Sequence, residues 1–225
     1  ALYLCKSIKM SEISQHIFQL REDFLKGTLS EQDVQTFPDI QFEKWLLEAV
    51  ETKVLESHAC ALSTVSSDFK PSSRIIYLRE FYKNEFYFYT NFNSKKAKDI
   101  EVNNNVCITF FWPELERQVR IEGKVFRASE DKGDAYFKAR PRDSQIGAWS
   151  SPQSKKLRNR SELEDFVKEK TLELKDLEIK RPTFWGGYVI HAQYYEFWQG
   201  RKNRLHDRIC YTLENQNWKI ERLAP

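Results

Sequence analysis

Apolar residues recur three and four positions apart in two stretches near the N-terminus, a spacing that predicts amphipathic helices. The first stretch covers residues 11–25 and ends before Gly27. The second covers residues 42–53, and Pro38 and Asp39 ahead of it supply a helix start signal. Two helices are therefore expected before the first strand.

From residue 59 onward the apolar spacing changes to alternation or to short apolar runs, which predicts β-strands. The alternation is explicit in residues 117–125, where Val119, Ile121 and Val125 point to one face and polar side chains point to the other. Strands are expected at residues 59–65, 74–78, 85–89, 106–112, 117–127, 187–198, 208–213 and 217–222. The turn-like stretch at residues 66–71 predicts a hairpin between the first two.

Short helices are expected between some of these strands. Ser94 and Ser129 are suitable N-cap residues for helices at 95–103 and 130–139. A capping box, Ser161 with Glu164, predicts a further helix. Its inward-facing residues are expected to be Leu163, Phe166, Val167, Leu174 and Leu177. Residues 138–160 are predicted to form a loop.

No internal repeat, low-complexity linker or change in composition divides the chain. The economical prediction is one mainly β domain with peripheral helices over residues 38–225, after an N-terminal segment of residues 1–37. A chain of 225 residues is long enough to bury a single core of useful size.

The composition excludes several classes of protein. A net charge of +3 argues against a dedicated nucleic-acid-binding protein. The sequence has no apolar run long enough to predict a membrane-spanning helix. Only seven glycines are present, with neither glycine-rich phosphate-binding motif, so side chains are expected to hold any phosphate. The cysteines and histidines do not cluster in the sequence, so no metal site is predicted. The cysteines, Cys5, Cys60, Cys107 and Cys210, are scattered, which predicts reduced thiols in a cytoplasmic protein.

The first candidate site lies in residues 196–208, where Arg204, His206 and Arg208 alternate. On an extended backbone these side chains would project from one face, so two guanidiniums would flank an imidazole. Such a group suits a phosphate, because a guanidinium binds two oxygens of an anion at once. The alternative is a cationic strand edge that discourages pairing with another sheet.

The second candidate is the basic region at residues 138–160, which holds seven basic residues and one acidic residue. Arg140 and Ser144 lie near Tyr136 and Trp149 in the sequence. Basic groups interleaved with aromatic rings suit a phosphorylated aromatic ligand, and they also suit single-stranded nucleic acid. A charged surface loop without a ligand is the remaining interpretation.

A third and weaker candidate joins Arg74 and Arg79 to the start of the helix expected at residues 95–103. Ser94 at the N-cap, with Lys95 and Lys96 behind it, could receive an anion through the helix dipole and the lysine charges together. Charged helix starts are common, so this feature alone indicates little.

Five segments of the chain carry long motifs. They are LERQV at 115–119, RPRDSQIGAW at 140–149, FWGG at 184–187, EFWQGRKNRLHDR at 196–208 and KIERLAP at 219–225. In composition and order these motifs resemble those of the pyridoxine 5′-phosphate oxidase family, FMN enzymes that make pyridoxal 5′-phosphate. The resemblance covers residues 20–225, and several long motifs in the same order make it specific.

The resemblance implies a split β-barrel that forms a homodimer, with FMN bound at the subunit interface. The implied flavin-binding residues are Arg74, Ile75, Ile76, Tyr77, Leu78, Arg79, Tyr89, Thr90, Lys95, Lys96, Gln118, Gln153, Ser154, Trp198 and Arg208. The implied substrate-binding residues are Arg21, Phe24, Arg79, Tyr136, Arg140, Ser144, Arg204 and His206, of which Arg204 and His206 would be catalytic. Residues 1–37 would include a helical lid over the substrate.

Two positions depart from the family pattern that the resemblance supplies. Arg79 stands where lysine is usual, which keeps the charge but changes its reach and hydrogen-bond geometry. Phe24 stands where tyrosine is usual, so a hydroxyl contact would be lost. Both changes bear on substrate affinity more than on the reaction.

The resemblance implies an oxidase that converts pyridoxine 5′-phosphate or pyridoxamine 5′-phosphate into pyridoxal 5′-phosphate, with O₂ as electron acceptor and H₂O₂ as product. Neither a metal, a membrane nor a nucleic acid is an expected partner. Two other hypotheses stay open. One is a non-catalytic protein of the same fold that binds FMN or pyridoxal phosphate, which the departures at Arg79 and Phe24 leave possible. The other is a single-stranded nucleic-acid binder built on the basic region.

Overall fold

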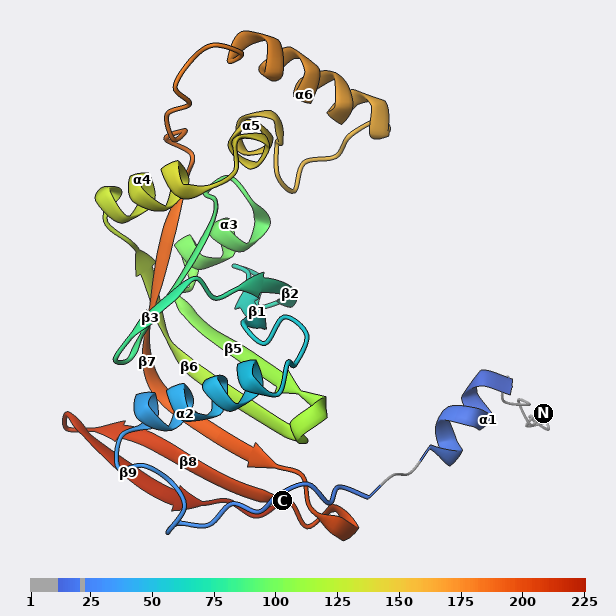
Figure 1. Ribbon diagram of the computed structural model, residues 1–225, viewed down its shortest axis with the longest axis vertical. Helices are drawn as coiled ribbons and strands as arrows, with labels where there is room; N and C mark the ends of the chain where they lie inside the picture. The colour runs from blue at the N-terminus through green and yellow to red at the C-terminus, as the bar shows by residue number, and fades with distance from the viewer. Residues whose placement is uncertain (1–11, 21–22) are drawn as a thin grey trace, which may run out of the picture.

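The computed structural model of this chain describes residues 12–20 and 23–225. Its centre is one antiparallel sheet with the strand order β2-β1-β5-β6-β7-β4-β3, to which β8 and β9 are added beyond β7 (Figure 1). The strands are β1 Ala59–Val65, β2 Pro71–Tyr77, β3 Glu80–Tyr82, β4 Glu85–Asn91, β5 Asn105–Trp112, β6 Arg117–Arg127, β7 Trp185–Gln199, β8 Asp207–Glu214 and β9 Asn217–Arg222. The helices are α1 Glu12–Gln19, α2 Pro38–Glu51, α3 Lys95–Val102, α4 Glu130–Ala139, α5 Arg142–Ser150 and α6 Arg160–Glu173, with 3-10 turns η1 Pro113–Leu115 and η2 Lys202–Arg204.

The long strand β7 organises the sheet. Its first half, from Trp185 to His191, pairs with β4, and its second half, from Tyr194 to Gln199, pairs with β8. The neighbouring strand β6 pairs with β7 along both halves. The sheet therefore branches and curls as a split barrel does, and the prediction of a mainly β fold with peripheral helices is confirmed.

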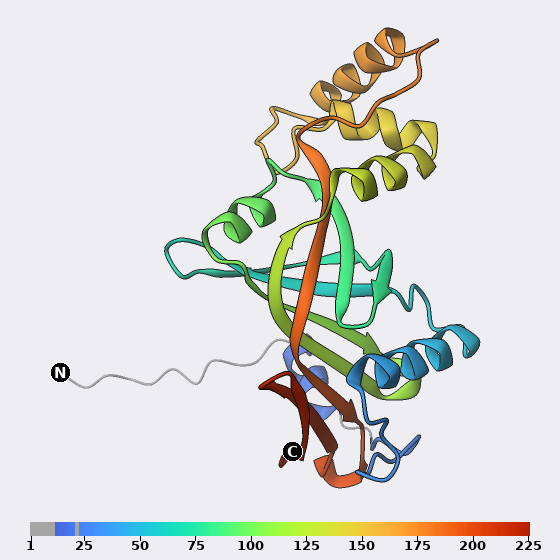
Figure 2. The ribbon, with the colours of Figure 1, turned by 90° about the vertical axis from the view of Figure 1, so that its left-hand side faces the viewer.

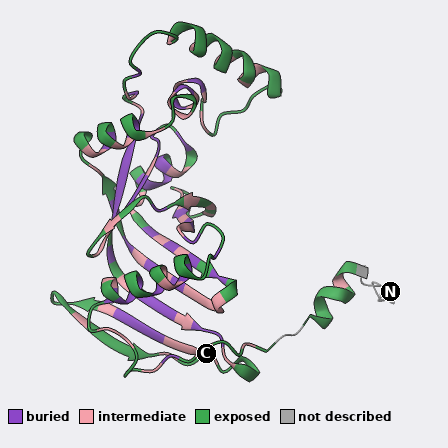
Figure 3. Cartoon of the chain, viewed as in Figure 1, coloured by how far each residue is buried: buried purple, intermediate pink, exposed green. Residues whose placement is uncertain are grey.

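A single large core fills the inside of this curled sheet. Alternate residues of β5 and β6 are buried, and Ile108, Phe110 and Val119 expose no more than 1% of their surface. Helix α2 covers them with Phe42 and Trp45, and Figure 3 shows the buried positions following the inner strands while α6 stays exposed. Burial of these aromatic rings is the main source of stability, because each removes a large apolar area from water.

The pairing of β6 with β7 shifts register between Glu122 and Gly123, because Gln193 of β7 is an extra residue without a partner on β6, which is typical of a β-bulge. A Cβ atom added at Gly123 would stand 2.1 Å from the carbonyl oxygen of His191. Only glycine allows the two backbones to approach so closely, and the bulge increases the local bend of the strand.

Replacing Gly123 with alanine is therefore expected to lower the free energy of unfolding by about 1–3 kcal/mol or more, because backbone has to shift to make room. Thermal denaturation followed by circular dichroism measures the change. The matched control is Gly147→Ala in α5, where an added Cβ meets no atom within 4 Å. That control should be neutral or stabilising, and equal destabilisation by both variants would contradict this explanation.

Three helices were predicted incorrectly in their limits or their caps. The first, expected at 11–25, ends at Gln19, and its apolar residues Ile13 and Ile17 are about 60% exposed. The helix predicted from a Ser161 cap begins at Arg160, because the Asn159 side chain accepts the hydrogen bond from the Glu162 amide instead. Helix α2 begins at Pro38, where the start signal was predicted, so it extends four residues ahead of the predicted apolar stretch.

The inward face expected for α6 is not buried. None of Leu163, Phe166 and Leu174 is more than partly buried, and Val167 and Leu177 are exposed. The loop predicted at residues 138–160 is wrong, since α5 occupies most of its first half. Proline and glycine in that sequence hide the helix from a periodicity test. The strand β3 was not predicted because three residues are too short to show a period.

The structure describes the state of three cysteines, and its described residues can be compared with the expected absence of a metal site and of a membrane-spanning helix. Cys60, Cys107 and Cys210 are free thiols, and Cys5 lies outside the described residues. Within residues 12–20 and 23–225, no three His, Cys, Asp or Glu side chains are grouped to hold a metal ion. No described helix is long and apolar enough to cross a membrane.

Candidate functional site

A pocket of about 490 Å³ lies where β2, β4, α4 and α5 meet. We call it the cationic pocket, and it is lined by Arg74, Ile75, Ile76, Tyr77, Arg79, Tyr89, Thr90, Lys96, Tyr136, Ala139, Arg140, Pro141, Ser144, Gln153 and Trp185. These residues come from six separate elements and the loops between them. The pocket brings together most of the predicted flavin-binding residues and four predicted substrate-binding residues, Arg79, Tyr136, Arg140 and Ser144.

The lining of the cationic pocket is strongly unbalanced in charge. It contains the cations Arg74, Arg79, Lys96 and Arg140 and, among the described residues that line it, no carboxylate. Burial lowers the pKa of Lys96, and the nearby charge of Arg74 lowers it further. Cations that are crowded and partly removed from water are unfavourable unless an anion joins them. The electrostatics therefore favour a phosphorylated ligand.

Arg140 gives the most direct sign of such a ligand. Its Nη1 atom is buried and has no hydrogen-bond partner, whereas nearly all buried polar groups in proteins are paired. Burial lowers the pKa of the Arg140 guanidinium, and the charge of Arg79 acts in the same direction. A guanidinium at this position can donate to a phosphate oxygen that enters the pocket.

Groups on β1, on β4 and in the loop after α5 hold two other cations of the pocket, Arg74 and Lys96, in place. Arg74 donates to the Leu62 carbonyl at 3.2 Å and to the Thr64 hydroxyl at 2.7 Å. Lys96 donates to the Thr90 hydroxyl at 3.1 Å and to Gln153 Oε1 at 3.2 Å. The Ser94 side chain caps α3, as predicted, and so fixes the turn that carries Lys96.

A stack of aromatic rings forms one wall of the cationic pocket. The Tyr136 ring lies on the Tyr89 ring with centroids 3.9 Å apart and planes 13° apart, and the Trp185 ring lies nearly parallel beside both, with centroids 6.2 and 6.0 Å away. The Arg140 guanidinium lies 4.6 Å from the centre of the Trp185 ring. Burial raises the pKa of Tyr89 to about 12, so its hydroxyl stays protonated. The stack fixes the position of Tyr136 and Arg140 before any ligand binds.

Most of the remaining predicted site residues form a second group around the far half of β7. Gln118, Trp198 and Arg208 are direct neighbours across β6, β7 and β8. The Phe24 ring contacts the rings of Trp198 and His206 edge-on, with centroids 5.6 and 5.4 Å away. We call Phe24, Gln118, Trp198, Arg204, His206 and Arg208 the β8 cluster. Arg21, also predicted here, lies outside the described residues.

The predicted alternation of Arg204, His206 and Arg208 on one extended strand is wrong. Residues 202–204 form the 3-10 turn η2, and β8 begins only at Asp207. Arg204 has a positive φ of 63° and is exposed. Arg208 is held on the sheet by the buried Glu196 carboxylate through two hydrogen bonds of 3.0 Å, so this pair carries little net charge. Arg204 is therefore the exposed cation of the predicted trio.

His206 has a defined hydrogen-bonding state. Its Nδ1 atom accepts a hydrogen bond from the Arg201 amide at 3.1 Å, so the neutral ring carries its proton on Nε2. Burial lowers the pKa of His206, and the charge of Arg204 lowers it further. Near pH 7 the imidazole is neutral and offers Nε2–H as a donor.

Replacing Arg204 with leucine is expected to raise the pKa of His206, because one of the two causes that lower it is removed. Titration of the imidazole by NMR measures the change. In the wild type, folding lowers the His206 pKa, so protonation below pH 6.5 costs stability, and the variant should lose less stability as the pH falls. An unchanged or lower pKa would contradict the assigned role of the Arg204 charge.

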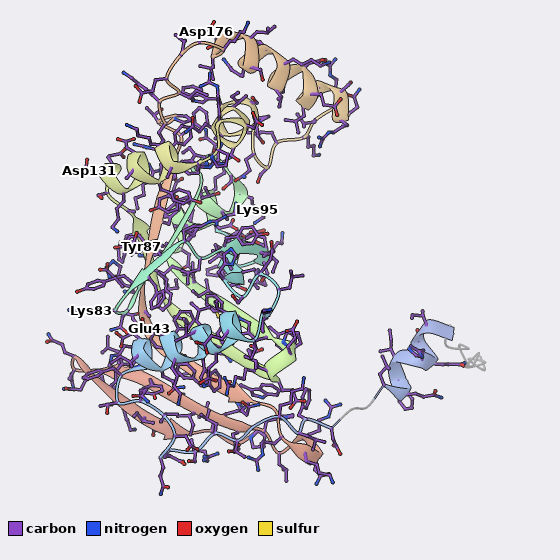
Figure 4. The ribbon with its side chains drawn as sticks, in the orientation of Figure 1. Glu43, Lys83, Tyr87, Lys95, Asp131 and Asp176 are labelled. Carbon is purple, nitrogen blue, oxygen red and sulfur yellow. The ribbon has the colours of Figure 1, made fainter. Side chains whose placement is uncertain are left out.

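The cationic pocket and the β8 cluster lie at opposite ends of the folded molecule. Figures 1 and 2 show α4 and α5 beyond one end of the sheet and η2 and β8 at the other. Three further predicted flavin-binding residues lie outside both groups. Leu78 is buried in the core, Ser154 is exposed beside the pocket, and Lys95 (labelled in Figure 4) pairs with Asp99. One chain alone does not bring all the predicted residues together.

The arginines of the basic region at residues 138–160 have different roles in the fold. Arg142 donates to the backbone carbonyls of Leu174, Lys175 and Leu177 and so holds the end of α6. Arg158 and Arg160 pair with glutamates one turn further along α6. Arg142 is therefore used by the fold itself, whereas Arg158 and Arg160 stay exposed on the surface.

Trp185 is the main pocket residue that sequence reasoning missed. It lies inside the FWGG motif at 184–187, so a signal was present, but the motif does not indicate that the ring lines a pocket. Ala139 and Pro141 also line the pocket and flank Arg140 in the sequence. Their side chains carry no polar group, so no chemical pattern marked them as site residues.

The curled antiparallel sheet and the cation-rich pocket define a split-barrel protein that binds a phosphorylated ligand. Comparison with known proteins agrees: the family described as "Pyridoxamine 5′-phosphate oxidase" matches residues 46–171, and "Pyridoxine 5′-phosphate oxidase C-terminal dimerisation region" matches residues 185–225. The chain belongs to the pyridoxamine 5′-phosphate oxidase family.

Individual relatives extend this similarity over nearly the whole chain. A protein of Leptospira interrogans named pyridoxine/pyridoxamine 5′-phosphate oxidase is 45% identical over 93% of this chain and 98% of its own length. A protein of the same name from Leptospira biflexa is 47% identical over 92% of this chain and 97% of its own length. Among solved structures, PhzG from Burkholderia lata, in complex with tetrahydrophenazine-1-carboxylic acid, is similar with a TM-score of 0.82 and 28% identity, over 88% of this chain and 98% of that one.

Proposed function

We propose that this protein is an FMN-dependent oxidase that converts pyridoxine 5′-phosphate or pyridoxamine 5′-phosphate into pyridoxal 5′-phosphate, with O₂ as acceptor and H₂O₂ as product. The buried, unpartnered Nη1 atom of Arg140 in a pocket without carboxylates is the observation that carries the proposal. The names of relatives at 45–47% identity support the same substrate class.

The residues of the cationic pocket fit FMN. Arg74 and Lys96 would bind its phosphate, and the exposed edge strand β2 offers unpaired backbone groups beside Ile75 and Tyr77 for the ring system. Thr90 and Gln153, which already orient Lys96, would complete the polar contacts. When bound, FMN would accept two electrons from the substrate and pass them to O₂.

Tyr136, Arg140 and Ser144 would hold the phosphate of the substrate. Arg140 supplies the free donor, Ser144 a hydroxyl and Tyr136 a phenol at the wall of the pocket. The aromatic stack and the Trp185 contact hold two of these groups in place before binding, which reduces the entropy lost when the substrate is positioned.

His206 and Arg204 would act at the C4′ group of the substrate. The Nε2–H of His206 would donate to the C4′ oxygen or nitrogen and orient it, and the exposed cation of Arg204 would help to hold the substrate there. Phe24, part of the proposed N-terminal lid in residues 1–37, packs on His206 and Trp198 and would exclude water from this side. Residues 38–225 would form the catalytic domain.

A homodimer would bring these two groups of residues together. The cationic pocket and the β8 cluster are too far apart in one chain to meet, and residues 185–225 match a dimerisation region. In a two-fold dimer the β8 cluster of one subunit can complete the pocket of its partner, which gives two equivalent sites. We propose the cytoplasm as the location of this dimer.

The proposed function is tested by reconstituting the purified protein with FMN and adding pyridoxine 5′-phosphate or pyridoxamine 5′-phosphate. We expect O₂ uptake, release of H₂O₂ and the appearance of pyridoxal 5′-phosphate in equal amounts. Flavin binding without turnover of either substrate would favour the non-catalytic alternative, for which the Arg79 and Phe24 departures are the only support.

A further inference from the structure

Arg181 lies outside every set of residues discussed so far, in the segment just before β7. Its side chain is only 8% exposed, which is unusual for arginine. All three guanidinium nitrogens have partners. Nε donates to Asp134 at 2.6 Å, Nη2 donates to Glu130, and Nη1 donates to the Trp185 carbonyl at 2.6 Å.

A glycine on α4 makes room for the Arg181 side chain. A Cβ atom at Gly133 would lie 3.1 Å from Arg181 Nε, which is tighter than most real contacts. A Cβ atom at Gly186 on β7 would meet Phe92 first, at 2.7 Å, and would reach Arg181 Nη1 only at an ordinary contact distance of 3.4 Å. Arg181 is therefore packed closely against α4 as well as bonded to the start of β7.

The two elements that Arg181 joins carry the wall of the cationic pocket. Tyr136 lies two residues after Asp134 on α4, and Arg140 caps the end of that helix. Trp185, whose carbonyl accepts from Arg181, stacks with Tyr136 and lies under the Arg140 guanidinium. A change in the distance between α4 and β7 would move the side chains of Tyr136 and Arg140 relative to the Trp185 ring.

We propose that Arg181 is a positioning residue that sets the distance between α4 and β7 and thereby the geometry of the phosphate-binding donors Tyr136 and Arg140. This inference rests on the proposed function for the identity of the substrate. It does not require Arg181 to touch the substrate. The end of α4 has a separate support, because Gln145 donates to the Phe137 and Arg140 carbonyls, so the helix can persist without Arg181.

The test compares the holoenzymes of Arg181→Leu, Arg181→Lys and the near-isosteric double variant Glu130→Gln with Asp134→Asn. Steady-state kinetics give KM and kcat, and calorimetry with inorganic phosphate gives the affinity of the pocket for an anion without turnover. For Arg181→Leu we expect KM and the phosphate dissociation constant to rise together by about tenfold, with kcat within about threefold of wild type. The double variant should shift in the same direction, and Arg181→Lys should recover part of the loss.

Lys138→Ala is the matched control, since Lys138 is on α4 and forms only an exposed ion pair of 3.9 Å with Glu178. Unchanged KM and phosphate affinity in Arg181→Leu would overturn the inference. Parallel losses of kcat, flavin content and melting temperature in the near-isosteric double variant would overturn it too, because they indicate a purely structural role. A wild type that oxidises neither substrate would refute the proposed function instead, and the phosphate arm would still decide the role of Arg181.

Discussion

Replacing Arg140 with leucine is expected to lower kcat/KM for pyridoxine 5′-phosphate by a factor of about 10² to 10³, mostly through KM. The Arg140 guanidinium has a buried donor without a partner, and its pKa is lowered by burial and by the charge of Arg79. A bound phosphate would therefore stabilise this guanidinium by a hydrogen bond and by its opposite charge. Removing one member of a buried charge-assisted pair costs about 3–4 kcal/mol, and each 1.4 kcal/mol is about a factor of ten. Steady-state kinetics at saturating FMN measure the loss.

Arg160→Ala is the control for this prediction, because Arg160 is an exposed residue paired with Glu164 on α6. It should leave both kinetic constants near those of the wild type. If Arg140→Leu changed kcat/KM by less than about threefold, the substrate phosphate would have to bind elsewhere, and the assignment of the cationic pocket to the substrate would be wrong.

The second large effect is expected from Arg204→Leu and His206→Ala, which should each lower the rate of flavin reduction by about 10² or more. The Nε2–H of His206 would orient the C4′ group in this proposal, and the exposed cation of Arg204 would hold the substrate beside it. Flavin content should stay close to one per chain, because neither residue lines the cationic pocket. Anaerobic stopped-flow with substrate separates this step from reoxidation by O₂.

Lys202→Ala provides the comparison for these two variants, since Lys202 is an exposed cation in the same turn η2. Its reduction rate should match that of the wild type. Normal reduction rates in both Arg204→Leu and His206→Ala would remove them from the catalytic step and leave the β8 cluster with a structural role.

The sequence predicts the parts of this fold in which local periodicity and packing agree. The strand predicted at 117–127, from alternation over residues 117–125, has the limits of β6, and the Ser94 and Ser129 caps locate α3 and α4. Helix α5 escapes prediction because Pro141 and Gly147 weaken its pattern while its buried side, Ile146 and Ala148, is fixed by a small core that other segments supply. Tertiary packing overrides weak local preference there.

The site, like the fold, has parts that the local sequence predicts and parts that it does not. Several residues of the cationic pocket could be taken from the third candidate site, with Arg74 and Arg79, and from the motif at 140–149, because each of these segments lies on one or two adjacent elements. The contacts of Phe24 with Trp198 and His206 join positions more than 170 residues apart, and no local pattern predicts them. The turn at Asn203 and Arg204 also defeats a strand pattern, because two consecutive residues with positive φ reverse the chain where alternation alone predicts an extended one.

The most direct test of the shared site is to mix two variants that are each inactive, Arg140→Leu and Arg204→Leu, and to let their subunits exchange. In a mixed dimer, one site receives both substitutions and the other receives neither. If the cationic pocket of one subunit is completed by the β8 cluster of its partner, random exchange at equal concentrations restores about a quarter of the wild-type activity. A mixture that stays inactive although mass spectrometry shows mixed dimers would contradict a site built from two chains.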